Sequence, residues 1–204
     1  MLKLYYAPGT ISIAVAIALE EAELAYEAIK VDFANAEQTK PAYLALNPKG
    51  RVPSLVTPDG ILTETPAILA YLAQRFPEKG LAPQDAFNFA RAQSFNAYLA
   101  ATVHVNHAHR HRGARWSDDP SCWDSMTAKV ASNMTECAAM IEQHYLDGPW
   151  VLGAAYSMCD PYLHLIARWL PVDGCDRAAF PKIQAHYEAM LARPATARIT
   201  ALHD

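Results

Sequence analysis

No long apolar run, basic block or paired-cysteine motif occurs in this 204-residue chain, and each absence excludes a class of protein. A membrane-spanning helix needs about 18–20 consecutive apolar residues, and no run of that length is present. A nucleic-acid-binding protein carries a dense basic patch, whereas the net charge here is -4 and the basic residues Arg110, Arg112 and Arg115 are scattered. We therefore expect neither a nucleic-acid partner nor a membrane partner.

The four cysteines all lie in the second half of the chain, and no two of them form a C-x-x-C pair. This spacing excludes a zinc ribbon and an internal dithiol. Unpaired cysteines of this kind are typical of a reducing compartment. We expect reduced, mostly buried thiols in a cytoplasmic protein; the four are Cys122, Cys137, Cys159 and Cys175.

The N-terminal segment has a superficial likeness to a secretory signal, because Lys3 precedes the apolar run 11–19. Pro8-Gly9 interrupts this segment early, and Glu20-Glu21 follows as the end of an amphipathic helix. A signal peptide would keep its apolar stretch uninterrupted up to a cleavage site. We expect a helix of the folded protein here, and a cytoplasmic location.

The first ~80 residues alternate between the periods of strands and helices. Their order predicts βαβ followed by ββα, in which the first two strands are parallel because a helix connects them. Pro58-Asp59-Gly60 predicts a tight turn between the last two strands, which are then antiparallel. The expected strands are 2–6, 26–33, 54–57 and 61–63, and the expected helices are 11–24, 40–46 and 66–76.

Strand patterns stop after a short linker rich in proline and glycine, at 77–83. The remaining chain predicts helices only, at 84–112, 122–146, 157–170, 180–192 and beyond Pro194. Ser157 and Asp160 have the spacing of a capping box, in which Ser157 bonds the amide of residue 160 and Asp160 reaches back. The predicted fold is an α/β domain followed by an all-α domain.

Two neighbouring motifs predict a binding site for a peptide with a free carboxylate. The run 47–53, Asn-Pro-Lys-Gly-Arg-Val-Pro, puts a Val-Pro step at the start of a strand. Glu64 and Thr65 then open a helix, with Thr65 at the N-cap and Pro66 at the first helical position. Free amides at a helix N-terminus attract an anion, so we expect a carboxylate there.

Together with Tyr5-Tyr6-Ala7-Pro8-Gly9 and with Gly153 followed by Ser157-Met158-Cys159-Asp160, these motifs resemble the cytosolic glutathione S-transferases over the whole chain. The Asn-Pro-Lys-Gly-x-Val-Pro run and the helical His104 are similar to the bacterial beta class. The resemblance implies a thioredoxin-like glutathione-binding domain at 1–79, a linker at 80–84, and a helical domain at 85–204 that lines the second-substrate pocket. It also implies a homodimer.

The resemblance further implies how glutathione is held. Pro53 matches the family's cis-proline, beside which the Val52 backbone pairs with the cysteinyl backbone of the ligand. Thr65 matches the site of the γ-glutamyl carboxylate, and Glu64 is placed to attract the adjacent ammonium. A cation is needed for the glycyl carboxylate, and Lys40, Lys49 and Arg51 remain alternatives.

Activation of the thiol is the open question, because Ile11 stands where beta-class relatives carry a cysteine. Lowering the pKa of a bound thiol from ~8.5–9 to ~6.5 needs about 3 kcal/mol of thiolate stabilisation. A hydroxyl donating to a charged sulfur supplies ~1.5–3 kcal/mol, and a helix N-terminus ~0.3–1 kcal/mol. Thr10, Ser12 and Tyr6 are the candidate donors; the alternatives are capping for Thr10 and Ser12, and core packing for Tyr6.

His104 matches the beta-class histidine that faces the thiol from the helical domain. His104, His107 and His111 share one helical face, a geometry that a metal could use, but no acidic residue accompanies them and we expect no metal. Tyr98, Trp116 and Trp169 are candidates for an apolar second-substrate pocket or for the core.

We therefore predict a homodimeric, cytoplasmic glutathione transferase that adds glutathione to a small apolar electrophile, as in detoxification. A glutathione-dependent disulfide or peroxide reductase remains an alternative, since two glutathiones can supply both sulfurs. A glutathione-binding protein without turnover is a second alternative, and a dehalogenase or isomerase a third.

Overall fold

The structure, a computed structural model, describes residues 1–203 and begins with a four-stranded mixed sheet. The strands are β1 (Leu2–Tyr6), β2 (Tyr26–Lys30), β3 (Ser54–Thr57) and β4 (Gly60–Thr63), in the order β2-β1-β3-β4. β1 and β2 are parallel, whereas β1 with β3 and β3 with β4 are antiparallel. This is the predicted thioredoxin-like arrangement.

The sheet register brings three separate segments of the sequence to one end of the strands. Tyr5 pairs with Ser54, and Ser54 pairs with Thr63 on its other side. The end of β1, the start of β3 and the end of β4 therefore lie next to one another. The motifs around Thr10, Pro53 and Glu64 follow or precede these strand ends directly.

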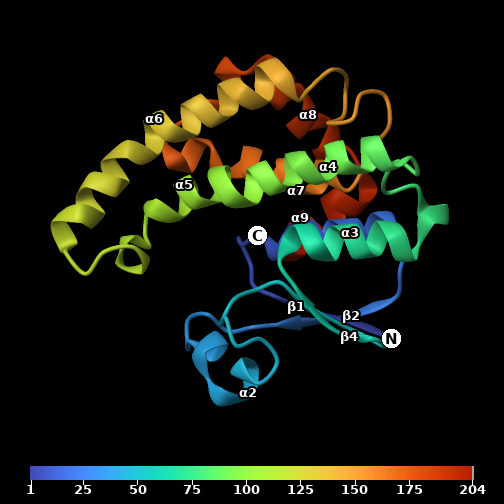
Figure 1. Cartoon of the computed structure of the whole chain (residues 1–204), viewed down its shortest axis with the longest axis horizontal. Helices are drawn as coiled ribbons and strands as arrows, with labels where there is room; N and C mark the ends of the chain where they lie inside the picture. Colours follow the sequence, from blue (N-terminus) through green and yellow to red (C-terminus); the bar gives the residue numbers. More distant parts are fainter. Residues whose placement is uncertain (204) are drawn as a thin grey trace. The chain divides into compact units, whose positions relative to one another are not determined.

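The helices of this region are α1 (Ser12–Glu21), α2 (Pro41–Leu44) and α3 (Thr65–Arg75). α1 is buried along its first eight residues, and its charged residues, Glu20 and Glu21, lie at its end. Figure 1 shows α3 and the final helix α9 (Pro194–His203) on one side of the strands and α2 on the other. α1 packs against both α3 and α9, so the core of this region includes residues from both ends of the chain.

The rest of the chain is helical, as predicted, and α4 (Ala86–Tyr98) continues through a π-helical segment (Leu99–Val103) into α5 (His104–His109). The long α6 (Pro120–His144) runs beside α5, and α7 (Cys159–Trp169) and α8 (Pro181–Leu191) complete the bundle (Figure 1). The core is formed by apolar side chains of several helices; among the largest fully buried ones are Phe95, Leu99, Met134 and Tyr162.

Two compact units result, and they divide the chain differently from the predicted domains 1–79 and 85–204. The first unit comprises 1–89 together with the residues from Leu191 onward, and the second comprises 90–190. The physical reason is that α9 packs on α1 and that Arg193 forms two hydrogen bonds to the carboxylate of Glu21. The last helix therefore belongs structurally with the sheet.

Several expected boundaries change for local reasons. The strand expected at 26–33 ends at Lys30, because Asp32 and Asn35 form a side-chain-bonded turn. The predicted hydrogen bond from the amide of residue 160 to the Ser157 hydroxyl is wrong: this hydroxyl accepts from the Cys159 amide, at 3.3 Å. The reciprocal half is present, since the Asp160 carboxylate accepts from the Ser157 amide at 2.6 Å.

The cysteines are as the sequence predicts: all four are free, and three of them are buried. Cys122 is partly exposed. Among residues 1–203, no helix combines the length and the apolar character that crossing a bilayer requires.

Candidate functional site

The loop that leads into β3 is held by a buried asparagine. Asn47 is 1% exposed, and its amide group donates to the Arg51 carbonyl at 2.7 Å and to the Ser54 hydroxyl at 3.1 Å. Its side-chain oxygen accepts from the Lys49 amide at 3.1 Å. The Tyr43 hydroxyl donates to the same Arg51 carbonyl, at 2.7 Å. These bonds fix the backbone immediately before Val52 and Pro53.

Gly50 is required by this loop for two reasons. Its φ is 61°, a region that residues with a side chain rarely adopt. A Cβ at this position would also lie 3.1 Å from the Gln38 carbonyl oxygen. Gly50 therefore permits this loop conformation, in which Val52 lies next to the end of the sheet.

The Val52–Pro53 peptide bond is cis, as predicted. Within residues 1–203, no backbone hydrogen bond joins Val52 to another backbone group. An unpaired amide and carbonyl at the start of a strand are what an added peptide strand uses for recognition. The backbone of Val52 is therefore available for the ligand pairing that the sequence predicts.

The N-terminus of α3 differs from the prediction by one residue. Glu64, not Thr65, is the N-cap, and Thr65 and Pro66 are the first two helical residues. Glu64 has a φ of 71°, uncommon for a residue with a side chain, and such conformations occur preferentially at functional sites. Its side chain makes no capping hydrogen bond, so the helix N-terminus can accept an external anion.

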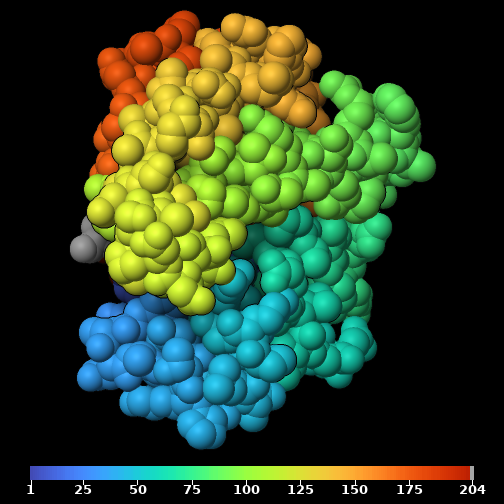
Figure 2. Space-filling view, turned by 60° about the vertical axis from the view of Figure 1, so that its left-hand side comes forward, coloured from blue at the N-terminus to red at the C-terminus, as the bar shows by residue number. Residues whose placement is uncertain are grey.

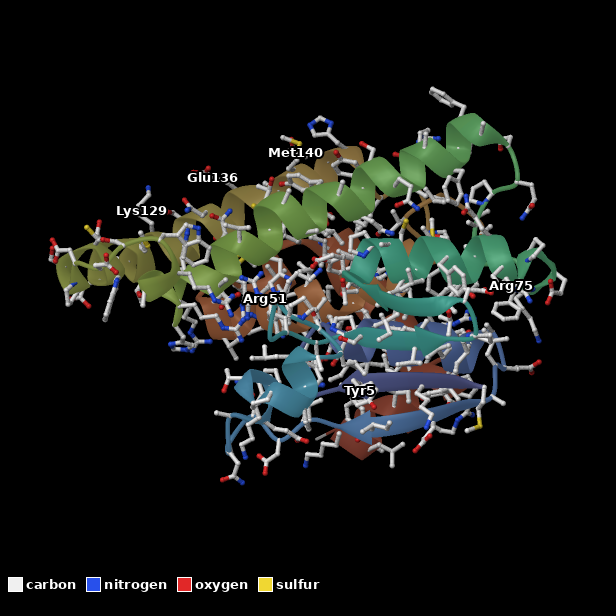
Figure 3. The ribbon with its side chains drawn as sticks, turned by 60° about the horizontal axis from the view of Figure 1, so that its bottom comes forward. Tyr5, Arg51, Arg75, Lys129, Glu136 and Met140 are labelled. Carbon is white, nitrogen blue, oxygen red and sulfur yellow. The ribbon has the colours of Figure 1, made fainter. Side chains whose placement is uncertain are left out.

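The structure distinguishes the three candidate cations for the glycyl carboxylate by their surroundings. Lys49 forms an ion pair with Glu64 and contacts the Thr63 hydroxyl at 2.6 Å. Its charge therefore lies at the α3 end, where the γ-glutamyl group is expected. Lys40 and Arg51 are exposed, and Figure 3 shows Arg51 on the segment that precedes β3. Both remain candidates for the glycyl carboxylate.

Thr10 and Ser12 form a hydrogen-bonded pair of hydroxyls. Their oxygens are 2.7 Å apart. Thr10 Oγ1 lies 2.8 Å from the Ala7 carbonyl, and Ser12 Oγ accepts from the Ala7 amide at 3.1 Å. Thr10 is half-buried, whereas Ser12 is 0% exposed. A group outside the fold can thus contact Thr10 but not Ser12.

Either hydroxyl of this pair could be the donor in the bond between them, and Ser12 Oγ also lies 3.3 Å from the Ala7 carbonyl oxygen. If Ser12 donates to Thr10 Oγ1, the Thr10 proton is directed to the Ala7 carbonyl and can turn to a thiolate instead. Hydrogen bonds in such a chain strengthen one another. A hydrogen bond to an ionised acceptor is also stronger than one to a carbonyl, so the exchange is favourable.

Tyr6, the third candidate, ends β1 and is half-buried, and its carbonyl accepts from the Val31 amide at 2.8 Å. Ile11 is 5% exposed and belongs to the core. The side chain at position 11 therefore points into the unit, where it packs and supplies no chemistry.

In the second unit, His104 follows the π-helical segment and lies beside Trp169, with ring centroids 5.0 Å apart. His107 stacks on the same indole at 4.0 Å with an interplanar angle of 9°. Trp169 is buried, which agrees with a core role. Trp116 is exposed and meets His109 edge-on at 4.4 Å. Tyr98 stacks on Tyr145, and burial raises the pKa of Tyr98.

Two features of this unit were not predicted from the sequence. One is the π-helical segment before His104, which lies inside the helix expected at 84–112. The other is Asp173, a buried carboxylate bonded to His107 Nδ1 at 2.7 Å. The acidic partner that the histidine cluster lacks in sequence is supplied from 66 residues further along the chain. Among the residues that the structure describes, no group of three side chains could hold a metal ion.

A cavity of about 320 Å³ lies at the other end of the sheet from the predicted site. It is lined by residues from the start of β1, from the β3–β4 turn and from α3, including Leu2, Pro58, Tyr71 and Arg75. Because β1 begins at this cavity and ends at Tyr6, the cavity and the Thr10–Pro53–Glu64 region are distinct places.

Comparison with known proteins agrees with this geometry. Residues 1–74 match the family described as the N-terminal domain of glutathione S-transferase. A solved structure of a glutathione transferase homologue from Sulfitobacter, with bound glutathione, is 51% identical, covers 99% of this chain and 98% of its own, and has a TM-score of 0.96.

Two curated relatives also align over nearly the full length. Glutathione S-transferase GstA of Escherichia coli O157:H7 is 28% identical and covers 95% of this chain and 94% of its own. Maleylacetoacetate isomerase of Pseudomonas aeruginosa is 30% identical and covers 95% of this chain and 93% of its own. The fold thus defines a protein with a thioredoxin-like sheet region followed by a helical region. The chain belongs to the glutathione S-transferase family.

Proposed function

We propose that this protein is a glutathione transferase that binds glutathione at the end of the sheet and activates its thiol with Thr10. The hydrogen-bonded pair of Thr10 and the fully buried Ser12 carries the proposal. Ser12 acts as a positioning residue, because it contacts Thr10 and no solvent. The Val52 backbone holds the cysteinyl part of the ligand, and the α3 N-terminus with Glu64 holds the γ-glutamyl part.

The energy required is within reach of this arrangement. One hydroxyl donating to a thiolate supplies ~1.5–3 kcal/mol, and the nearby N-terminus of α1 adds ~0.3–1 kcal/mol. Together they lower the thiol pKa by about 1–3 units, at ~1.4 kcal/mol per unit. The isoleucine at position 11 does not prevent this, since a hydroxyl needs no covalent step.

We include in the proposal the features carried over from the family resemblance: beta-class membership, a homodimer and a cytoplasmic location. The Asn-Pro-Lys-Gly-x-Val-Pro loop and His104 support the first. Four free cysteines support the last, because such thiols are typical of a reducing compartment. His104 is proposed as a residue that faces a small apolar electrophile.

Turnover of an aryl halide tests the reaction. We expect wild type to add glutathione to the halide and Thr10→Val, which keeps the shape and removes the hydroxyl, to be slower by about 10–100-fold, equivalent to ~1.4–2.8 kcal/mol. Thr39→Val, at an exposed position, is the matched control. Reduction of a disulfide without aryl-halide turnover would contradict the proposal and favour the reductase.

A further inference from the structure

Lys49 connects two parts of the predicted glutathione site through its side chain. Its Nζ lies 2.5 Å from Glu64 Oε1 and donates to Thr63 Oγ1 at 2.6 Å. Lys49 belongs to the loop before β3, whereas Thr63 ends β4 and Glu64 is the N-cap of α3. Figure 2 shows the segment before β3, in cyan, and the segment of β4 and α3, in blue-green, next to each other on the surface. The Lys49 ammonium therefore lies at the N-terminus of α3.

The backbone on both sides of this contact is fixed. The Lys49 amide donates to the side-chain oxygen of Asn47, which is 1% exposed. Glu64 has a φ of 71°, and its side chain makes no capping hydrogen bond to α3. The Glu64 carboxylate therefore pairs with Lys49 and leaves the first amides of α3 without a side-chain cap.

The ion pair is accessible, so a ligand can exchange partners with it. The side chains of Lys49 and Glu64 are 43% and 61% exposed. An ion pair with this exposure adds little to stability, so the fold loses little when the pair opens. The Thr63 hydroxyl is a second partner for the ammonium, and it keeps Lys49 at the start of α3 when Glu64 binds another cation. The site thus holds one anion and one cation side by side.

A free α-amino acid group matches these two charges, because one carbon carries both its ammonium and its carboxylate. Glu64 can accept from the ammonium, while Lys49 and the α3 N-terminus attract the carboxylate. A ligand with the ammonium alone displaces Lys49 from Glu64 and offers it no anion in exchange. A ligand with the carboxylate alone draws Lys49 away and leaves Glu64 without a cation. Only a ligand with both charges replaces the ion pair completely.

We propose that Lys49 makes this site specific for ligands whose end carries both a free ammonium and a free carboxylate, as the γ-glutamyl end of glutathione does. The inference rests on the glutathione binding of the proposed function. Lys49 has two opposed effects: in the free protein it competes with the ligand ammonium for Glu64, and in the complex it attracts the ligand carboxylate. A lysine that only ties the loop to α3 would affect every ligand alike.

Two analogues of glutathione separate these effects. Glutaryl-cysteinyl-glycine lacks the ammonium, and 4-aminobutyryl-cysteinyl-glycine lacks the carboxylate. In Lys49→Met, which keeps the length of the side chain without its charge, the dissociation constant of the glutaryl peptide should rise by about 3–5-fold, and that of the aminobutyryl peptide should fall by about 3–5-fold, as for the loss of an exposed ion pair. Lys49→Arg, which keeps the charge, should retain the wild-type order of affinities. Calorimetric titration of each protein with glutathione and both analogues measures these constants.

Lys3→Met is the matched control, because Lys3 forms an ion pair of similar exposure with Glu27 on the same sheet, at 2.9 Å and with side chains 42% and 46% exposed. Its removal should leave the constants of both analogues unchanged. Shifts of both analogues in the same direction in Lys49→Met, no shift of either, or the same opposed shifts in Lys3→Met overturn the inference while glutathione binding stands. A wild type that does not bind glutathione contradicts the proposed function, and the inference with it.

Discussion

Because Ser12 is buried, Thr10 is the member of the hydroxyl pair that could contact a bound thiol. The sequence offers three hydroxyls near the end of β1, with no rule for choosing among them. Only the folded chain shows that Ser12 is fully covered and that Thr10 lies 2.7 Å away at the half-buried edge. Burial at a turn depends on which side chains from elsewhere cover it, so residue spacing alone does not give the choice.

His164 is a second residue whose chemistry follows from its surroundings. It is buried on α7 and stacks on Tyr187 at 4.8 Å. Burial, with the neighbouring His186 as a smaller cause, lowers the pKa of His164 from 6.5 to about 3. Its neutral form is therefore strongly favoured in the folded state.

This shift predicts a loss of stability in mild acid. Between pH 6.5 and about 3 the unfolded chain binds a proton at His164 that the folded chain does not. The contribution of His164 to stability is therefore retained above pH 6.5 and lost as the pH falls, by up to ~1.4 kcal/mol per pH unit. His164→Phe, which keeps the stacking, should flatten urea-unfolding free energies over this window. His144→Phe, at an exposed position, should leave the slope unchanged, and an unchanged slope in His164→Phe would contradict the assignment.

At the scale of elements, the glycines of the loops are distinguishable by what surrounds them. Gly50 and Gly80 have nearly the same backbone angle, with φ values of 61° and 67°. A Cβ at Gly50 meets the Gln38 carbonyl at 3.1 Å, whereas nothing lies within 4 Å of a Cβ at Gly80. Alanine at either position would therefore strain the backbone. Of these two positions, only Gly50 would also suffer a steric clash.

We expect Gly80→Ala to lower the free energy of unfolding by ~1–2 kcal/mol, the cost of a left-handed backbone. Gly50→Ala should cost more, because the loop must also move away from Gln38. It should weaken glutathione binding as well, since Val52 follows two residues later. Urea unfolding and calorimetric titration with glutathione measure both effects. Equal destabilisation with unchanged affinity in both variants would show that the loop does not shape the site.

Element boundaries were predicted well where side-chain patterns are strong and less well where hydrogen bonding decides. The four strands and the all-helical second half follow from apolar periodicity and turn residues. The N-cap of α3 falls on Glu64 instead of Thr65, because the chain enters the helix through a positive φ. The π-helical segment before His104 was not predicted, because it lies inside a pattern that is otherwise helical throughout.

At the scale of the molecule, most of the features that the sequence did not predict are contacts between residues far apart in the chain. The chain returns to the sheet unit at its end, where Arg193 and Arg198 pair with Glu21 and Glu20 of α1. In the second unit, Asp173 meets His107 across 66 residues. The outer face of α6 stays exposed, and Figure 3 shows Lys129, Glu136 and Met140 directed away from the bundle. Motifs predict which residues bind a ligand, whereas these pairings become visible only in three dimensions.

The site itself is assembled from three chain segments that the sheet register brings together, and we propose that its function depends on Thr10 acting at that place. The thiol pKa of glutathione bound to wild type and to Thr10→Val tests this claim most directly, through the ultraviolet absorbance of the thiolate as a function of pH. Wild type should hold the pKa below its solution value, and Thr10→Val should raise it by about 1–2 units, which corresponds to the loss of one hydrogen bond to a charged sulfur. A wild-type pKa equal to that of free glutathione, or an identical pKa in the two proteins, would contradict the account.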